Sequence, residues 1–355
     1  MAGMWDPFTL GRIRLDHRLA LAPMTRSRAD ADGSPNGLMV EYYRQRATLG
    51  LLITEGTQPS DDGQGYPYTP GIYTESHIAG WRKIADAVHE AGSHLFIQLM
   101  HVGRVAHPDN HPTGAQSVAP SAIAAGHDMF TPTGMQPAPE PRALATGEIP
   151  GIEEEFAQAA ENAITAGADG VEIHGANGYL PWQFLNASAN QRTDQYGGSI
   201  ENRARFTLET TKLVAQRIGA DRTGIRLSPA VSFNGLDEGP GYKDTYRYLL
   251  RELDTLGLAY IHLFYFGDDE FLREIRDMLS TPLLLVRAGR DYDSIERDLA
   301  DDLADLYPIA TDAISNPDLV HRLKAGAPLA PGDSSTFYGG DATGYTDYPA
   351  LDETN

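Results

Sequence analysis

Eight short apolar runs, separated by longer amphipathic segments, constrain the fold of this chain more than any other feature. Most of these runs are apolar at consecutive positions, which is typical of strands in a parallel sheet that helices cover on both faces. The runs cover residues 19–25, 49–56, 94–101, 169–175, 223–229, 258–264, 282–289 and 306–312.

The segments between the runs have a helical pattern. Residues 77–92, 152–168, 201–220 and 244–257 each combine an apolar stripe with charges and end near a glycine, which is a common helix stop. Eight strand–helix units predict a (β/α)₈ TIM barrel, and we expect it to carry an N-terminal hairpin lid. A doubly wound open sheet is the main rival, but it would need a GxGxxG motif after an early strand, and the sequence has none there.

Two regions interrupt the alternation. Residues 104–148 are rich in Pro, Gly, Ala and Ser and are too long for an ordinary connector, so we expect an insertion that caps the barrel mouth. Residues 329–355 contain many turn-forming residues and predict a C-terminal extension on the surface. We see no linker, and therefore expect one domain over residues 1–355.

Composition narrows the class of protein. Hydrophobic residues make up 41% and charged residues 22% of the 355, as in an ordinary soluble globule. A formal charge of −21 argues against nucleic acid and anionic membranes as partners. The absence of cysteine excludes disulfides and thiolate metal sites. We expect a cytoplasmic enzyme without a metal that acts on a small molecule, as a monomer or homodimer.

In a barrel of this kind the active site lies at the C-terminal ends of the strands. A buried arginine such as Arg226 needs an acceptor, and Gln98 offers an amide from an otherwise apolar strand. Amide and guanidinium groups together suit a planar heterocycle with carbonyls and ring nitrogens. The strand ends carry Met24, Thr25, Arg26, Glu55, Gly56, Gln98, His101, His174, Asn177, Tyr179, Arg226, Gly289, Arg290, Thr311 and Asp312.

The stretch VEIHGANGYLPWQF, residues 171–184, holds the densest group of polar residues. His174, Asn177 and Tyr179 leave one strand end within six residues. A single buried histidine is more often structural than catalytic, but three such groups at one strand end favour a shared function.

Long motifs of this chain resemble those of the Old Yellow Enzyme family of flavin-dependent ene-reductases. The resemblance is carried by HGANGYLPWQFLN and by NQRTDQYGGSIENRARF at residues 190–206. It extends over nearly the whole chain through LALAPMTRSRA, TEGTQPS, GYPYTPGIY, FIQLMHVGR, IRLSP, VRAG, ISNPDLVHRL and TFYGG…GYTDYP. It implies a TIM barrel that binds FMN and uses NAD(P)H to reduce the activated C=C bond of α,β-unsaturated carbonyl compounds.

The resemblance also implies roles for single residues. Met24 and Thr25 would contact the flavin, Thr25 near its C4 carbonyl, and Gly56 would let the ring pass close to the backbone. Gln98 and Arg226 would hold the pyrimidine edge of the ring. For His101 and Arg104, we expect a structural role at least as much as a contact with the substrate.

For the substrate, the resemblance implies that His174 and Asn177 hold the carbonyl oxygen while Tyr179 protonates the α-carbon. Tyr66 and Met100 would line the pocket.

The eighth apolar run departs from the family. Relatives carry a Gly-Arg pair there, whose arginine grips the flavin phosphate, whereas this chain has Ala310 and Thr311 followed by Asp312. Arg290 and Gly289, the backbone amides around residues 288–289, or a helix that starts at Asn316 are expected to take over the phosphate.

The departure leaves two alternatives open. One is a flavin-independent or non-redox isomerase or cyclase that uses His174, Asn177 and Tyr179 as a carbonyl clamp and general acid. The other is a degenerate barrel that binds a ligand and catalyses nothing.

Overall fold

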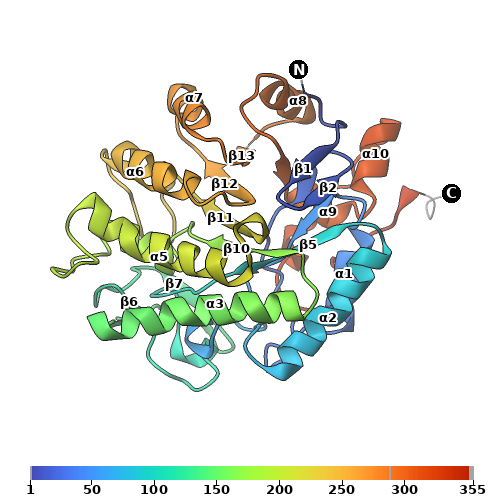
Figure 1. The fold of residues 1–355 in the computed structure, drawn as a ribbon. Helices are drawn as coiled ribbons and strands as arrows, with labels where there is room; N and C mark the ends of the chain where they lie inside the picture. The colour runs from blue at the N-terminus through green and yellow to red at the C-terminus, as the bar shows by residue number, and fades with distance from the viewer. Residues whose placement is uncertain (1, 288, 352–355) are drawn as a thin grey trace.

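The computed structural model of the protein describes residues 2–287 and 289–351. Within these residues, eight parallel strands form one sheet in the order β13-β12-β11-β10-β5-β4-β3-β14. A parallel bridge between Leu284 and Leu306 brings the first strand of this order against the last, so the sheet curls into a nearly closed barrel. Figure 1 shows the helices arranged around these strands. The predicted (β/α)₈ barrel is confirmed.

The barrel strands coincide with the eight apolar runs, and helices follow at the predicted segments. The strands of the barrel are β3 (Leu19–Leu21), β4 (Leu51–Ile53), β5 (His94–Leu99), β10 (Gly170–His174), β11 (Thr223–Leu227), β12 (Tyr260–Tyr265), β13 (Leu283–Arg287) and β14 (Tyr307–Ile309). The helices are α1 (Gly37–Gln45), α2 (Glu75–Glu90), α3 (Ile149–Thr165), α4 (Leu180–Leu185), α5 (Ile200–Ile218), α6 (Tyr242–Asp254), α7 (Asp269–Met278), α8 (Tyr292–Ala300), α9 (Thr311–Ser315) and α10 (Leu319–Ala325).

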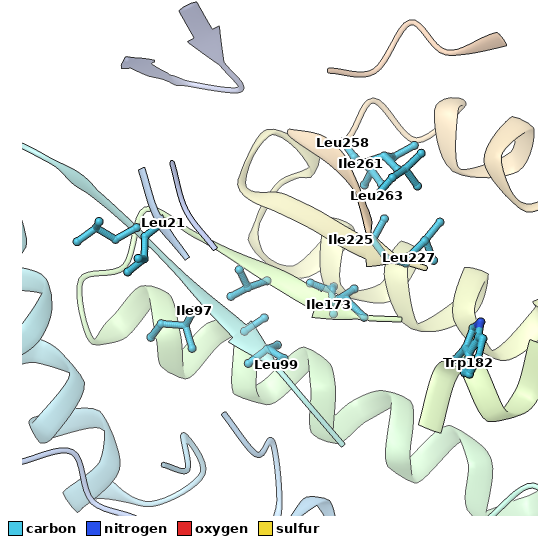
Figure 2. Packing of buried hydrophobic residues seen from close by; sticks show 14 of the residues in the cluster. Leu21, Ile97, Leu99, Ile173, Trp182, Ile225, Leu227, Leu258, Ile261 and Leu263 are labelled. Atoms are coloured by element: carbon cyan, nitrogen blue, oxygen red, sulfur yellow. The ribbon is translucent and has the colours of Figure 1, made fainter. Parts of the chain in front are cut away.

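The barrel strands bury alternate residues on opposite faces. Ile97, Ile173 and Ile225 belong to the large apolar cluster that the strands share with the surrounding helices, and Figure 2 shows them on neighbouring strands. Their sequence neighbours therefore point into the barrel, because successive side chains of a strand alternate. This alternation decides which polar groups enter the barrel interior.

A hairpin closes one end of the barrel. Its strands, β1 (Phe8–Leu10) and β2 (Ile13–Leu15), pair antiparallel. Leu10 and Ile13 join a second apolar cluster with Phe96 and Tyr260 from the barrel interior. The predicted N-terminal hairpin lid is confirmed, and it leaves the opposite end of the barrel for the active site.

The insertion of residues 104–148 contains four short strands, β6 (Val118–Ala119), β7 (Asp128–Thr131), β8 (Gly134–Pro137) and β9 (Arg142–Ala143). Ala125 and Met129 of this insertion share a third apolar cluster with Tyr66, Met100 and Tyr179. The insertion thus packs beside three residues that the sequence assigned to the active site.

Among the described residues, no helix has the length and apolar character that a membrane crossing requires. The same residues contain no group of three or more His, Cys, Asp or Glu side chains that could hold a metal ion.

Glu153 is a buried carboxyl on the face of α3 that meets α5. Burial, together with the nearby carboxylate of Glu209, raises the pKa of Glu153 to about 8. Glu209 in turn accepts a hydrogen bond of 2.9 Å from the hydroxyl of Tyr196. Glu153 is therefore protonated in the folded protein at neutral pH, whereas an unfolded chain would have released that proton.

We predict that Glu153→Gln stabilises the protein increasingly as the pH rises. The folded pKa lies above the unfolded one, so the wild type loses stability between about pH 4.5 and pH 8, and glutamine removes this loss. The gain should be roughly 1–3 kcal/mol at pH 8.5 and close to zero at pH 4.5. Urea unfolding at both pH values measures it. Glu154→Gln, at an exposed position on the same helix, is the control, and an equal gain for both variants would contradict the account.

Candidate active site

A cavity of about 410 Å³ brings together most of the residues that the sequence placed at the C-terminal strand ends. Its walls combine polar side chains with an apolar surface from the first and last strands. The lining residues are Ala22, Pro23, Met24, Thr25, Arg26, Gln98, Met100, His174, Asn177, Tyr179, Arg226, Phe233, Phe264, Val286, Ala310, Thr311, Ile314, Phe337 and Tyr338.

His174 ends β10 and is buried at the cavity wall. Burial and the charge of Arg226 lower the pKa of His174 well below its ordinary value, so the ring is neutral near pH 7. Its Nδ1 accepts a hydrogen bond from the backbone N–H of Ala176 at 3.4 Å. A neutral ring with an accepting Nδ1 carries its proton on Nε2. His174 therefore offers one hydrogen-bond donor at Nε2.

Asn177 has a left-handed backbone conformation, with φ of 55°, which asparagine tolerates better than most residues. Its backbone N–H donates to the hydroxyl of Ser228 at 2.9 Å, and its carbonyl accepts from Asn234 at 2.8 Å. These two bonds fix the turn that carries the side chain. The side-chain Oδ1 is buried without a partner among the described residues, so the site has an unused polar group.

Tyr179 is buried where the cavity meets the insertion. Burial and the neighbouring Tyr66 raise the pKa of Tyr179 well above its ordinary value. The two phenol oxygens lie 3.1 Å apart, and the ring of Tyr179 stands edge-on to that of His174 with centroids 4.8 Å apart. Tyr179 therefore keeps its proton at neutral pH. Tyr66 contacts Tyr179 and is not among the residues that line the cavity.

Gly56 follows β4 and is not among the lining residues of the cavity. A Cβ atom at this position would lie 2.4 Å from the Sδ of Met100, which does line the cavity. Glycine at position 56 therefore leaves room for the side chain of Met100.

His101 and Arg104 stabilise the loop after β5. His101 is fully buried, and its Nδ1 accepts from the backbone N–H of Gly103. Arg104 donates to the carbonyls of Ile123 and Gly235. Both residues lie outside the cavity lining, in agreement with a structural role.

The C-terminal tail contributes a wall that the sequence did not predict. Arg26 donates to the carbonyls of Phe337 and Gly344, and Arg28 donates to those of Thr336 and Asp341. These bonds hold Phe337 and Tyr338 at the cavity. Tyr345 is fully buried and stacks on Tyr42 with ring centroids 4.3 Å apart. The tail is therefore anchored to the barrel, and the TFYGG motif was the signal for it.

A buried polar layer lies inside the barrel next to the cavity. Glu172 of β10 is paired in register with Gln98 of β5, and Arg226 of β11 with His262 of β12. The carboxylate of Glu172 accepts from Nε2 of Gln98 at 2.7 Å and from Nδ1 of His262 at 2.8 Å. Glu172 and His262 were not predicted from the sequence, although a charged residue inside the apolar run VEIH was a signal for the first.

A second cavity, of about 340 Å³, lies where β12 and β13 end, and Phe266 of its wall packs against Phe264 of the first cavity with ring centroids 4.8 Å apart. Arg287 and Arg290 line it together with Tyr265, Phe266, Gly267 and Gly289. The guanidinium of Arg287 contacts Asp269 and Asp298, and that of Arg290 lies 3.7 Å from Asp298. Arg290, which the sequence suggested as a phosphate ligand, therefore lies in the wall of this second cavity. Arg287 was missed, and residue 288 lies outside the described residues.

The region after β14 differs from the expectation in two ways. Asn316 does not start a helix: it follows α9, and its side chain donates to the carbonyls of Asp312 and Ala330. The carboxylate of Asp312 accepts a hydrogen bond of 2.8 Å from the hydroxyl of Tyr292 and is not among the residues lining either cavity. Ala310 and Thr311 do line the main cavity.

These features fit a planar heterocycle that carries a phosphate. The Nε of Arg226 is buried without a partner among the described residues, and the Gln98 amide lines the same cavity, so both groups are available to ring carbonyls and nitrogens. The apolar wall of Ala22, Pro23 and Val286 suits the faces of such a ring. The second cavity with two arginines suits a phosphate at the end of a side chain.

A comparison with protein families matches residues 3–330 to the NADH:flavin oxidoreductase / NADH oxidase family. Among curated proteins, the chain is 42% identical to a probable flavin mononucleotide-dependent alkene reductase of Leishmania infantum, over 98% of this chain and 97% of that protein. It is 44% identical to 12-oxophytodienoate reductase 1 of Oryza sativa subsp. japonica, over 98% of this chain and 93% of that protein.

Solved structures are also similar to this chain over nearly its whole length. The structure of morphinone reductase in complex with tetrahydroNAD is 44% identical, has a TM-score of 0.94, and the alignment covers 99% of this chain and 98% of that chain. The old yellow enzyme homologue from Zymomonas mobilis is 37% identical with a TM-score of 0.94, covering 99% and 100% of the two chains.

We predict that Gly56→Ala destabilises the protein through Met100. The new methyl group would displace the Met100 side chain, at a cost of about 1–3 kcal/mol, as for other overpacked sites. Thermal unfolding measures the loss. Adding Met100→Ala removes the Sδ and Cε atoms that clash and should recover most of it relative to Met100→Ala alone. Equal losses with and without Met100→Ala would show that Met100 is not the reason for the glycine.

Proposed function

The chain belongs to the NADH:flavin oxidoreductase / NADH oxidase family, the Old Yellow Enzyme family, and is an FMN-dependent ene-reductase that uses NAD(P)H; from this premise we propose the roles of its residues. His174 and Asn177 bind the carbonyl oxygen of an α,β-unsaturated substrate, and Tyr179 protonates its α-carbon. The observation that carries this proposal is the convergence of the three side chains on one cavity that also holds Gln98 and Arg226.

Gln98 and Arg226 would hold the polar edge of the flavin ring, and Met24 and Thr25 would contact the ring. Support comes from the buried Nε of Arg226, which has no partner in the described part of the chain, and from the place of all four residues in the cavity lining. When bound, the flavin supplies the hydride that the β-carbon of the substrate takes up. Met100, for which Gly56 leaves room, lines the substrate side of the cavity, and Tyr66 lies behind the lining in contact with Tyr179.

His174 and Asn177 activate the alkene. The Nε2–H of the neutral His174 and the amide of Asn177 donate to the carbonyl oxygen, where negative charge develops as the β-carbon is reduced. Because His174 is already neutral and its Nδ1 is engaged by Ala176, the donor needs no tautomer change before reaction. Two preorganised donors of this kind form an oxyanion hole.

Tyr179 completes the reduction. The α-carbon gains electron density as the β-carbon accepts a hydride, and Tyr179 is held protonated at neutral pH by its burial. It can therefore transfer its proton to a strongly basic carbon without ionising beforehand. The hydroxyl of Tyr66 lies 3.1 Å from that of Tyr179 and is placed to help return the proton.

We predict that Tyr179→Phe separates the two half-reactions. Reduction of the bound flavin by NAD(P)H should stay within about threefold of the wild type, because that half-reaction needs no proton donor on carbon. Reoxidation by an enone should slow by about 100-fold or more, the usual contribution of a general acid. Anaerobic stopped-flow absorbance measures both rates. Tyr66→Phe is the control and should show a much smaller loss; an unimpaired Tyr179→Phe would exclude Tyr179 as the proton donor.

The second cavity would hold the flavin phosphate, with Arg290 and Arg287 in place of the arginine that the eighth strand lacks. Support comes from the two guanidinium groups and from Gly289, whose exposed backbone with φ of 73° suits a phosphate-binding turn. Asp298 shares its carboxylate between the two arginines and holds them in place until a phosphate provides further acceptors. Asp312 does not oppose the phosphate, because Tyr292 binds its carboxylate.

We predict that Arg290→Ala weakens FMN binding by about 10- to 100-fold, the value of one charge-assisted contact. The loss should be specific to the phosphate, so the affinity for riboflavin should be unchanged. Fluorescence titration of the apoprotein with either flavin measures this. Arg297→Ala, at an exposed position on α8, serves as the matched control. Equal losses of FMN and riboflavin affinity in Arg290→Ala would place the phosphate elsewhere.

Of the alternatives that the sequence left open, the reductase is the one the comparisons support. The non-redox isomerase or cyclase was motivated by the missing arginine and by Asp312. The arginines of the second cavity and the engagement of Asp312 by Tyr292 remove that motive. We further infer a cytoplasmic enzyme of one domain that works as a monomer or homodimer, in keeping with its composition.

A further inference from the structure

We propose that Glu172 is a positioning residue for the flavin site, which orients the amide of Gln98 and supplies the negative charge that balances Arg226. The proposal rests on FMN binding in the main cavity. It extends the site by one layer into the barrel, to a carboxylate and an imidazole that do not line the cavity themselves.

The geometry of the layer is set by the strand register. Glu172 lies directly opposite Gln98 on β5, and its other neighbour in the sheet is Gly224 on β11. A side chain at Gly224 would overlap the ring of Tyr260, so glycine at this position lets that ring fill the space below the layer. Glu172 is fully buried, with neighbours on β5 and β12 that reach its carboxylate.

Glu172 decides which end of the Gln98 amide faces the cavity. A carboxylate only accepts hydrogen bonds, so it takes the Nε2 of Gln98, at 2.7 Å, and leaves the amide oxygen for a ligand. Without an acceptor at this position, the amide could turn and offer either atom. The acceptor end of Gln98 is thereby fixed before the ligand arrives.

Glu172 also determines the charge of the layer. Burial opposes its ionisation, but His262, Arg226 and Gln98 outweigh this effect and hold the pKa of Glu172 below its ordinary value. Burial lowers the pKa of His262, which is therefore neutral and donates from Nδ1 to the carboxylate. The layer contains one cation, Arg226, and one anion, Glu172, so its net charge is zero.

This balance has a consequence for the cofactor. A flavin ring gains negative charge on reduction, which Arg226 favours and the carboxylate of Glu172 opposes. Removing the charge of Glu172 should therefore strengthen binding of the reduced flavin relative to the oxidised flavin. We expect the ratio of the two affinities to change by about tenfold, which corresponds to a rise of about 30 mV in a two-electron midpoint potential.

The test is the midpoint potential of bound FMN in Glu172→Gln, measured by spectroelectrochemistry. Glutamine has the size of glutamate and keeps both contacts: its oxygen accepts from Gln98, and its NH₂ donates to His262 once that ring changes tautomer. The variant therefore removes the charge and little else. We expect the tenfold change in Glu172→Gln and less than a threefold change in Glu172→Asp, which keeps a carboxylate.

Glu153→Gln is the matched control, since it makes the same substitution at another buried glutamate, on α3 and outside both cavities, whose carboxyl is already protonated at neutral pH, so no charge is removed. A wild-type potential in Glu172→Gln, or an equal shift in Glu153→Gln, would overturn the proposal. A wild-type protein that binds no FMN would instead refute the function on which the proposal rests.

If Glu172→Gln does not fold, His262→Leu tests whether the charge of Glu172 affects the flavin potential. Loss of the imidazole removes one of the two donors to the carboxylate and raises its pKa, so protonation should shift the potential in the same direction at pH 6 and less at pH 8. Tyr260 and Arg226 are the other ionisable groups of the layer that face the carboxylate, and both remain in this variant. A His262→Leu holoprotein that follows the wild type at both pH values would also overturn the proposal.

Discussion

The parallel register of four neighbouring barrel strands is the constraint on which the rest of this site depends. It sets Gln98 opposite Glu172, His174 opposite Arg226, and Arg226 opposite His262. A slip of one residue in any of these pairs would turn its polar side chains toward the helices and its isoleucines and leucines into the barrel. The same apolar residues that secure the helices around the barrel therefore also hold the polar groups at the level of the cavity.

Burial gives these groups their chemical states. It keeps Tyr179 protonated and His174 neutral at the same pH, which provides a proton donor and a hydrogen-bond donor in one cavity. It also makes any unpaired charge costly, and the pairing of Glu172 with His262 beside Arg226 meets that requirement. The insertion and the anchored tail extend the buried environment over the cavity, since Met129 packs in the cluster of Tyr179 and Phe337 lines the wall.

Much of this arrangement could be predicted from the sequence. The eight apolar runs and the glycines that end the helices predicted the barrel. The polar residues of these runs and their ends predicted the members of the site, Gln98, His174, Asn177, Tyr179 and Arg226. Glu172 and His262 were missed because a single polar residue in an apolar strand does not reveal its partner on another strand. The role of Phe337 and Tyr338 depends on bonds from Arg26 and Arg28, more than three hundred residues earlier in the chain. The helix expected at Asn316 was wrong because the helix there begins at Thr311 and ends before that residue.

We propose that one cavity binds FMN through Gln98 and Arg226 and an activated alkene through His174, Asn177 and Tyr179. The most direct measurement is an anaerobic absorbance titration of the FMN-loaded protein. The account predicts that one equivalent of NADH or NADPH bleaches the flavin band and that one equivalent of an α,β-unsaturated ketone restores it, with the saturated ketone as product. A protein that ignores added FMN, or a bleached flavin that the ketone does not restore, would contradict the claim.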